Sequence, residues 1–255
     1  MKVRVLGCSG GIGGPQLRTT SLLVDNDILI DAGTGVGDLG LEDLSAIDHV
    51  FITHAHLDHI ACLPLLVDTV GDTRSRPLTV WTTRATLDVL RRHIFNWSIW
   101  PDFTEIPSAD RPLMRFEALS VGDVIELGGR RITVLPAQHT VPAVGYGLGS
   151  ARGSLAFSGD TTACPEFWQA VNVMPDLRYL IIETAFPDSE QPLATVSKHL
   201  CPRMLKDELK QLQRSPEIYI THLKPSQAGK TMDEIQQLME PHGPRMLQND
   251  QIFEL

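Results

Sequence analysis

Residues 53–59 read Thr53-His54-Ala55-His56-Leu57-Asp58-His59 and follow a mostly apolar run that begins at His49. Three imidazoles and a carboxylate within so few residues are unusual, and these side chains are common zinc ligands. A loop that leaves a strand can direct alternate side chains toward two points. The alternative is that Asp58 caps a following helix and the histidines are ordinary polar loop residues. The density of ligand types favours a metal site.

The hydrophobic pattern on both sides of this stretch predicts strands and helices in alternation. Apolar residues after His59 recur at helical spacing through Val70 despite Pro64, so the histidine cluster lies at a strand-to-helix junction. Turn residues 25–27 predict a hairpin between two short strands. Strands are predicted at 2–6, 21–24, 28–30, 49–53, 78–82, 131–135, 154–158, 179–182 and 217–221, and helices at 84–95, 166–171 and 202–212. This alternation indicates an α/β architecture with helices outside the sheets.

Length and composition fit one folded unit. The chain has 255 residues, 42% of them hydrophobic, and glycine and proline are spread along it without a linker or a repeat. We therefore predict a single domain over residues 1–255. The chain reaches Gly7 before any apolar run of signal-peptide length, and no later run approaches the roughly 18 apolar residues of a membrane span. We expect a soluble, cytoplasmic protein with no membrane partner.

Charge and cysteine usage narrow the class further. The formal net charge of −9 repels polyanions, so we expect no extended nucleic-acid surface. A small anionic substrate stays compatible, because two bound divalent cations would make the site locally positive. The cysteines lie far apart without paired spacing, so we expect reduced and mostly buried thiols at Cys8, Cys62, Cys164 and Cys201.

The chain resembles the metallo-β-lactamase superfamily, whose defining motif has the pattern of residues 54–59. The rest of the family pattern is present in order: Asp31 ends a predicted strand, and His139, Asp160 and His222 each follow one. The resemblance implies a four-layer αββα sandwich with the metals at one edge of two sheets. It implies that Asp31 orients a ligand from behind. It also divides the ligands between two ions: His54, His56 and His139 on one, Asp58, His59 and His222 on the other, with Asp160 shared.

The residue types favour zinc as the metal. Members of the superfamily that hold two irons usually carry a carboxylate where this chain has His56, so nitrogen-rich ligation indicates Zn²⁺. Mn²⁺ and Fe²⁺ stay as alternatives, because selectivity also depends on availability. We expect two divalent ions per chain.

A glycine-rich stretch, residues 7–14, follows the first predicted strand. It lacks the Gly-Lys-Ser/Thr ending of a phosphate loop, and a strand follows it where such a loop would lead into a helix. We interpret it as a structural loop near the metals. Contact between its amides and a substrate phosphate is the alternative.

Other segments are similar to the class II cyclic-nucleotide phosphodiesterases. They are residues 54–60, the stretch His199-Leu200-Cys201-Pro202 and the stretch Thr221-His222-Leu223-Lys224-Pro225. Lys198, where that group typically has glycine, and Cys201, where it often has threonine, depart from the pattern. The aromatic stretch 95–103 is also similar to that group. Its Trp97 and Trp100, with Lys224, are candidate substrate contacts, while core or homodimer-contact roles are the alternative for the aromatic residues.

The resemblance implies hydrolysis of 3′,5′-cyclic AMP or GMP to the 5′-monophosphate. The chief rival is the tRNA 3′-processing endonuclease, which shares the metal set and grips tRNA with a long arm between the third and fourth motifs. His139 and Asp160 are only 21 positions apart (160 − 139), which leaves no room for that arm. A small-molecule lactone or thioester hydrolase and a non-catalytic metal-binding protein of this fold are further alternatives.

The expected mechanism follows from two-metal chemistry. Ions about 3.5–4 Å apart lower the pKa of a shared water toward about 7, so that a bridging hydroxide attacks phosphorus. The leaving ribose 3′ oxygen needs a proton as its bond breaks. His199 is the candidate donor, and a histidine without function is the alternative for it. The predicted catalytic residues are His199 and the metal ligand Asp58.

Overall fold

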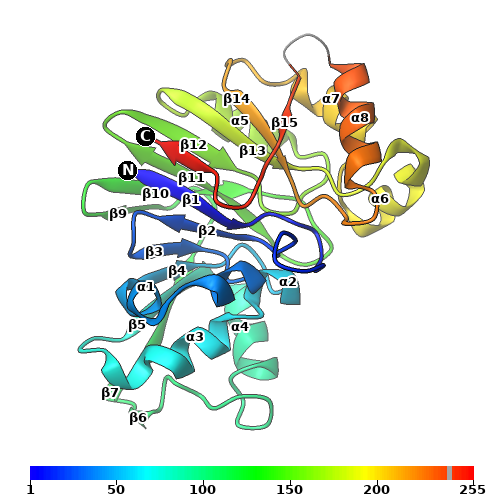
Figure 1. Ribbon diagram of the computed structural model, residues 1–255. Coiled ribbons are helices and arrows are strands. Elements are labelled where there is room, and N and C mark those ends of the chain that lie inside the picture. The colour runs from blue at the N-terminus through cyan, green and yellow to red at the C-terminus, as the bar shows by residue number, and fades with distance from the viewer. Residues whose placement is uncertain (240–242) are drawn as a thin grey trace.

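The computed structural model describes residues 1–239 and 243–255. Within these ranges, two seven-stranded sheets pack face to face, and helices cover their outer sides (Figure 1). The first sheet has the order β16 (Ile252–Glu254), β1 (Lys2–Gly7), β2 (Ser21–Val24), β3 (Ile28–Ile30), β4 (His49–Phe51), β5 (Leu78–Thr83) and β8 (Met114–Leu119). The second has the order β15 (Arg245–Met246), β14 (Glu217–Thr221), β13 (Leu177–Glu183), β12 (Gly153–Phe157), β11 (Val144–Ser150), β10 (Arg130–Pro136) and β9 (Val124–Leu127).

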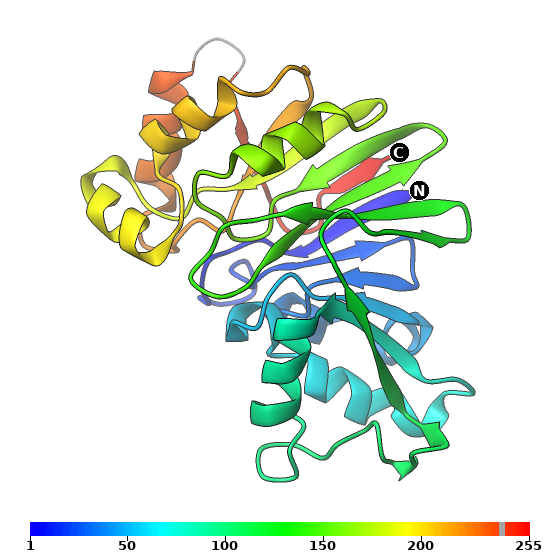
Figure 2. The ribbon, with the colours of Figure 1, turned by 180° about the vertical axis from the view of Figure 1, so that it is seen from behind.

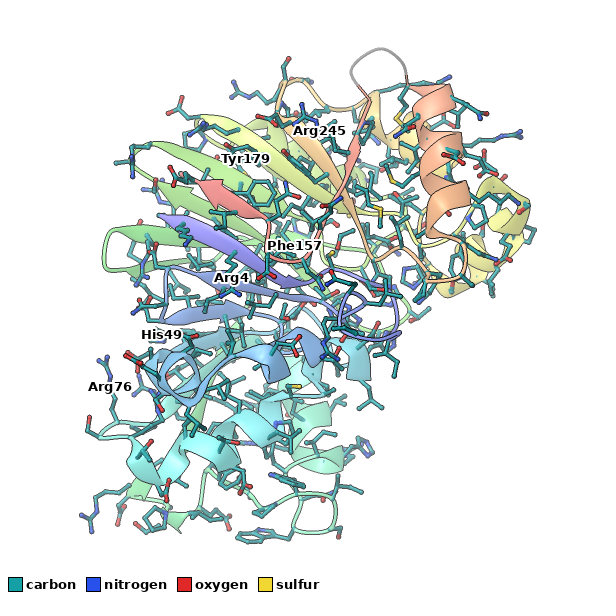
Figure 3. The ribbon with its side chains drawn as sticks, in the orientation of Figure 1. Arg4, His49, Arg76, Phe157, Tyr179 and Arg245 are labelled. Carbon is teal, nitrogen blue, oxygen red and sulfur yellow. The ribbon has the colours of Figure 1, made fainter. Side chains whose placement is uncertain are left out.

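The central strands are apolar on both faces, because each sheet is covered on both sides. Side chains alternate along a strand, so Leu155 and Phe157 of β12 face the other sheet while Ala156 faces the outer helices. Phe157 and Tyr179 belong to the inner layer between the sheets (Figure 3). Leu29 of β3 faces outward in the same way.

Helices close the two outer layers. On the first sheet lie α1 (Leu41–Ala46), α3 (Leu63–Val70) and α4 (Arg84–His93), with apolar residues of α3 and α4 in one buried cluster. On the second lie α5 (Pro165–Asn172), α7 (Pro202–Leu209) and α8 (Ala228–Leu238). Seen from behind, α5 crosses the outer face of the second sheet (Figure 2). The four-layer αββα sandwich is therefore confirmed.

Shorter elements complete the chain: α2 (Leu57–Ile60), α6 (Gln191–Ser197), the hairpin of β6 (Pro107–Ser108) with β7 (Arg111–Pro112), and 3-10 turns at Thr34–Asp38, Gly71–Thr73 and Asp188–Glu190. The single helical run expected after His59 is divided into two helices. α2 ends at Ile60, and α3 begins at Leu63 with Pro64 in its first turn. The predicted hairpin of β2 and β3 is confirmed. The strands β6, β7, β8, β9, β15 and β16 and the helices α1, α6 and α8 had no counterpart among the sequence predictions.

The structure also bears on the expectations about membrane-spanning segments and cysteines. No helix in residues 1–239 or 243–255 is long and apolar enough to cross a membrane. All four cysteines fall in these ranges as free thiols, with Cys164 and Cys201 buried and the other two half-buried.

Candidate metal centre

The seven predicted ligands all follow strands that end at one edge of the sandwich. Residues 54–59 follow β4, and Asp160 and His222 follow β12 and β14. Strands β12, β13 and β14 are parallel neighbours, and β10, which His139 follows, runs in the same direction because β11 is antiparallel to both β10 and β12. Side chains beyond the carboxyl ends of such strands converge at that edge.

One group of possible metal-binding residues consists of His54, His56, His139 and Asp160, whose ligand atoms lie within 4.8 Å of one another. Nε2 of His139 lies 3.2 Å from Nδ1 of His56. Oδ2 of Asp160 lies 3.6 Å from Nε2 of His54 and 3.9 Å from Nε2 of His139. A cation between these atoms would be surrounded by nitrogen and oxygen, the ligands that zinc accepts.

The other group consists of Asp58, His59, Asp160 and His222, again within 4.8 Å. Here the opposite oxygen of Asp160 is used. Oδ1 of Asp160 lies 3.3 Å from Nε2 of His59 and 3.2 Å from Nδ1 of His222. Oδ2 of Asp58 lies 3.7 Å from Nε2 of His222. The structure thus brings all seven predicted ligands together, with Asp160 between the two groups.

Unpaired nitrogen atoms fit these residues to a cation. Among the described residues, buried Nε2 of His54, Nε2 of His59 and Nδ1 of His222 lack a hydrogen-bond partner. Buried polar atoms are rarely left unpaired without a reason. Burial also lowers the pKa of His139 to about 4 and that of His222 to about 3, so both imidazoles are neutral at pH 7. Neutral imidazoles with free lone pairs are what a divalent metal requires.

Hydrogen bonds behind the ligands fix which nitrogen faces the centre. Asp31 is fully buried, and its Oδ2 accepts from Nδ1 of His59 at 2.7 Å while its Oδ1 accepts from the amide of Thr53 at 2.8 Å. The Thr53 hydroxyl lies 3.0 Å from Nδ1 of His54. Nδ1 of His139 donates to the carbonyl of Lys198 at 3.1 Å. Each contact leaves Nε2 of the histidine free to face a metal, and Asp31 lies behind His59, one of the predicted ligands.

His199 lies beside both groups without belonging to either. Its ring centroid is 4.8 Å from that of His139 and 5.1 Å from that of His222, on which it stacks. Its Nδ1 lies 2.7 Å from Oε1 of Glu183, a fully buried carboxylate that ends β13. Glu183 was not among the site residues predicted from the sequence. The available signal was a carboxylate at the end of the apolar run Leu180-Ile181-Ile182.

Electrostatics of this pair favour a charged imidazole. Burial opposes the charge on His199, but the charge and hydrogen bond of Glu183 together with the charge of Asp160 outweigh burial, so the pKa of His199 is raised above its ordinary value. The pKa of Glu183 is raised mainly by burial, against which the charge of His199 acts. A proton is therefore held at the His199–Glu183 pair next to the two ligand groups.

The glycine-rich loop packs directly against this centre. A Cβ on Gly10 would lie 2.4 Å from the carbonyl oxygen of His222, so only glycine fits there. The amide of His222 donates to the carbonyl of Cys8 at 2.8 Å. The predicted position of the loop, near the ligands, is confirmed.

The three candidate substrate contacts lie in different places. Nζ of Lys224 donates to the carbonyl of Gly10 at 2.9 Å and lies 5.8 Å from the ring centre of Phe186, close to His199 and His222. Trp97 and Trp100 do not join the cluster. Their segment, between α4 and β6, lies at the opposite end of the molecule from α6 and α7 in both views (Figures 1 and 2). The segment follows α4 on the outer side of the first sheet, and Trp100 packs against the buried cluster between that sheet and its outer helices.

The αββα fold with this double ligand group at its edge defines a metallo-β-lactamase-type hydrolase. A family model described as "Beta-lactamase superfamily domain" matches residues 26–239, and the chain therefore belongs to the β-lactamase superfamily.

Among its relatives is a protein of Yersinia pestis named "Probable 3′,5′-cyclic-nucleotide phosphodiesterase", 26% identical over 88% of this chain and 78% of its own length. Ribonuclease Z of Haloarcula marismortui is 30% identical over 58% of this chain, which spans 47% of that relative's length. The crystal structure of unliganded yeast PDE1 matches with a TM-score of 0.82 and 20% identity, covering 100% of this chain and 99% of that one. The last likeness concerns the fold.

Proposed function

We propose that this protein hydrolyses 3′,5′-cyclic nucleotides to 5′-monophosphates with two divalent metal ions. The observation that carries the proposal is the position of His199. The centroid of its ring lies 4.8 Å from that of His139, which belongs to the first ligand group, and 5.1 Å from that of His222, which belongs to the second. The buried carboxylate of Glu183 contacts Nδ1 of the ring. A proton donor next to a two-metal site suits a phosphodiester with a basic leaving oxygen. The relative named as a cyclic-nucleotide phosphodiesterase supports the same substrate class.

The two carboxylate oxygens of Asp160 face different ligand groups, and this supports a carboxylate that two ions share. Oδ2 faces His54 and His139, while Oδ1 faces His59 and His222. His56 would complete the first group and Asp58 the second. Zn²⁺ is the metal we infer from the nitrogen-rich ligands. Bound there, divalent ions supply positive charge for the phosphate and an acidified water at neutral pH.

The role of His199 follows from its two nitrogens. Nδ1 is bound to Glu183, so Nε2 is the nitrogen that serves the substrate. Protonated at Nε2, the imidazole gives its proton to the ribose 3′ oxygen as the bond from that oxygen to phosphorus breaks and a hydroxide oxygen derived from water bonds to phosphorus. The product is the 5′-monophosphate with a free 3′ hydroxyl. Lys224, whose ammonium lies beside this pair, is suited to bind the phosphate charge.

A tRNA 3′-endonuclease is the second candidate, because ribonuclease Z of Haloarcula marismortui is 30% identical over part of the chain. Two features favour the smaller substrate. The residues between His139 and Asp160 form strands β11 and β12 of the second sheet, so they are not available as a tRNA-gripping arm. The formal charge of −9 opposes a polyanion.

One preparation of zinc-loaded protein, assayed on cyclic AMP, cyclic GMP and a tRNA precursor, tests the proposal. We expect turnover of a cyclic nucleotide to exceed tRNA cleavage. Efficient 3′ cleavage of the tRNA without cyclic-nucleotide turnover would reverse the ranking. Adding a lactone panel and bis(p-nitrophenyl) phosphate to the assay separates a small-molecule esterase from a phosphodiesterase, and inactivity on every substrate would favour a non-catalytic metal-binding protein.

A further inference from the structure

Lys198 ends helix α6 in a backbone conformation that a lysine seldom adopts. Its φ of 53° and ψ of 49° are left-handed, where glycine is favoured. Its amide donates to the carbonyl of Thr195 at 3.3 Å, which closes the last turn of the helix. Closing this turn requires only the backbone. The lysine side chain therefore calls for a separate explanation.

That side chain folds back onto a predicted metal ligand. Nζ of Lys198 donates to the carbonyl oxygen of His139 at 3.0 Å, and Nδ1 of His139 donates to the carbonyl oxygen of Lys198 at 3.1 Å. The two residues are 59 positions apart and belong to different segments, the loop after β10 and the end of α6. Two hydrogen bonds in opposite directions join them.

We propose that Lys198 is a positioning residue that fixes His139 as a metal ligand. The Lys198 carbonyl holds the proton of His139 on Nδ1 and so directs the lone pair of Nε2 to His54, His56 and Asp160. The ammonium holds the two backbone segments together, which keeps that carbonyl within reach of the ring. Such support behind a metal-binding histidine typically changes metal affinity by about 10- to 100-fold.

The sign of the effect separates this role from simple electrostatics. The Lys198 ammonium repels a bound cation, so loss of its charge alone would tighten metal binding. Loss of the support would weaken metal binding. Because the left-handed backbone favours glycine, Lys198→Gly also relieves local strain, so a purely structural role in α6 predicts unchanged metal affinity and equal or greater thermal stability in this variant.

The test measures Zn²⁺ affinity by competition with a chromophoric chelator, without any substrate. Lys198→Met keeps the aliphatic stem and removes the donors, Lys198→Gly also relieves the backbone, and Lys198→Arg keeps both charge and donor. We expect about tenfold weaker binding of one of two Zn²⁺ ions in the Met and Gly variants, and near wild-type affinity in the Arg variant. Asp176→Gly is the matched control, since Asp176 is also left-handed, with a φ of 45°, in the turn between α5 and β13.

Met and Gly variants that bind Zn²⁺ as tightly as the wild type, or more tightly, would overturn the role of Lys198. The inference rests on the metal binding in the proposed function and not on the substrate. Wild-type protein that binds two Zn²⁺ ions but hydrolyses no cyclic nucleotide would therefore count against the proposed function alone. Wild-type protein that binds no Zn²⁺ would overturn both.

Discussion

Oε1 of Glu183 lies 2.7 Å from Nδ1 of His199, and this contact ties the candidate acid to the end of a central strand. The amide of Thr161 also donates to Oε1, at 3.1 Å, and the amide of Leu200 to Oε2, at 3.3 Å, so the carboxylate cannot turn away. A carboxylate held in this way fixes the orientation of the imidazole and stabilises its charged form. The pair therefore controls when His199 carries a proton.

Replacing Glu183 with glutamine should move the pH profile of the enzyme. Glu183 raises the pKa of His199 against the effect of burial, so its neutralisation lowers that pKa. A proton donor works only while protonated, and activity is lost as the pH rises through its pKa. We therefore expect the alkaline limb of kcat/KM for a cyclic nucleotide to shift to lower pH in Glu183→Gln.

Glu208→Gln is the control for this shift. Glu208 is also a buried carboxylate, but it accepts from Nε1 of Trp168 at 2.7 Å and from the amide of Cys164, away from His199. Its variant should keep the wild-type alkaline limb. The same limb in wild type and Glu183→Gln would show that His199 is not the group whose proton limits the reaction.

Metal content follows from the ligand groups. We expect near two equivalents of zinc per chain after purification without a chelator, measured by elemental analysis, because two groups of four ligand atoms share one carboxylate. Well-folded protein that retains less than half an equivalent of any transition metal after supplementation would rule out the two-metal site.

The shared position of Asp160 predicts unequal losses among ligand variants. His56→Ala removes one ligand from one group, so about one equivalent should be lost. Asp160→Ala removes an oxygen from each group and should lower the content of both. Elemental analysis of the two variants, with folding checked by circular dichroism, makes the comparison. Equal stoichiometry in both would mean that Asp160 does not bridge.

Gly10 provides a steric test of the loop beside the centre. A methyl group at this position would lie 2.4 Å from the carbonyl oxygen of His222, and the backbone there must shift to accept it. Gly10→Ala should lower the free energy of unfolding by about 1–3 kcal/mol and reduce zinc retention. In Gly37→Ala the new methyl meets no described atom within 4 Å, so denaturant unfolding of that variant should differ little from the wild type.

The sequence predicted best what is encoded locally. The ligand stretch 54–59 is contiguous and follows an apolar strand, so its residue pattern indicated a metal site. The αββα sandwich and the ligands His139, Asp160 and His222, which are far apart in the sequence, came from the resemblance to the superfamily. Glu183 escaped because its partner His199 lies 16 positions away, and a single carboxylate at a strand end has many ordinary roles. The pairing of β16 with β1 joins the two ends of the chain, and such long-range contacts leave no local pattern.

The aromatic stretch 95–103 illustrates a different limit. Aromatic residues suit a core, an interface or a nucleobase equally well, and composition cannot separate these uses. In the structure Phe95 is 1% exposed and packs in the buried cluster on the outer side of the first sheet, whereas Trp97, on the same segment, is 61% exposed. The position of the whole segment, beyond α4, separates it from the ligand groups, and that position depends on how α4 packs.

The last prediction concerns the leaving group that His199 serves. If His199 donates a proton to the leaving oxygen, His199→Ala should slow hydrolysis of a cyclic nucleotide by about 10²- to 10⁴-fold, the range typical of a general acid. Its loss should spare the metal content, because His199 belongs to neither ligand group. Nitrophenolate leaves without a proton, so the deficit should shrink for a p-nitrophenyl ester and across a series of esters as the pKa of the leaving group falls. His56→Ala, which damages the metal site itself, should slow both substrates. Equal losses on both substrates in His199→Ala, with metal content intact, would instead assign His199 to binding the charge of the phosphate.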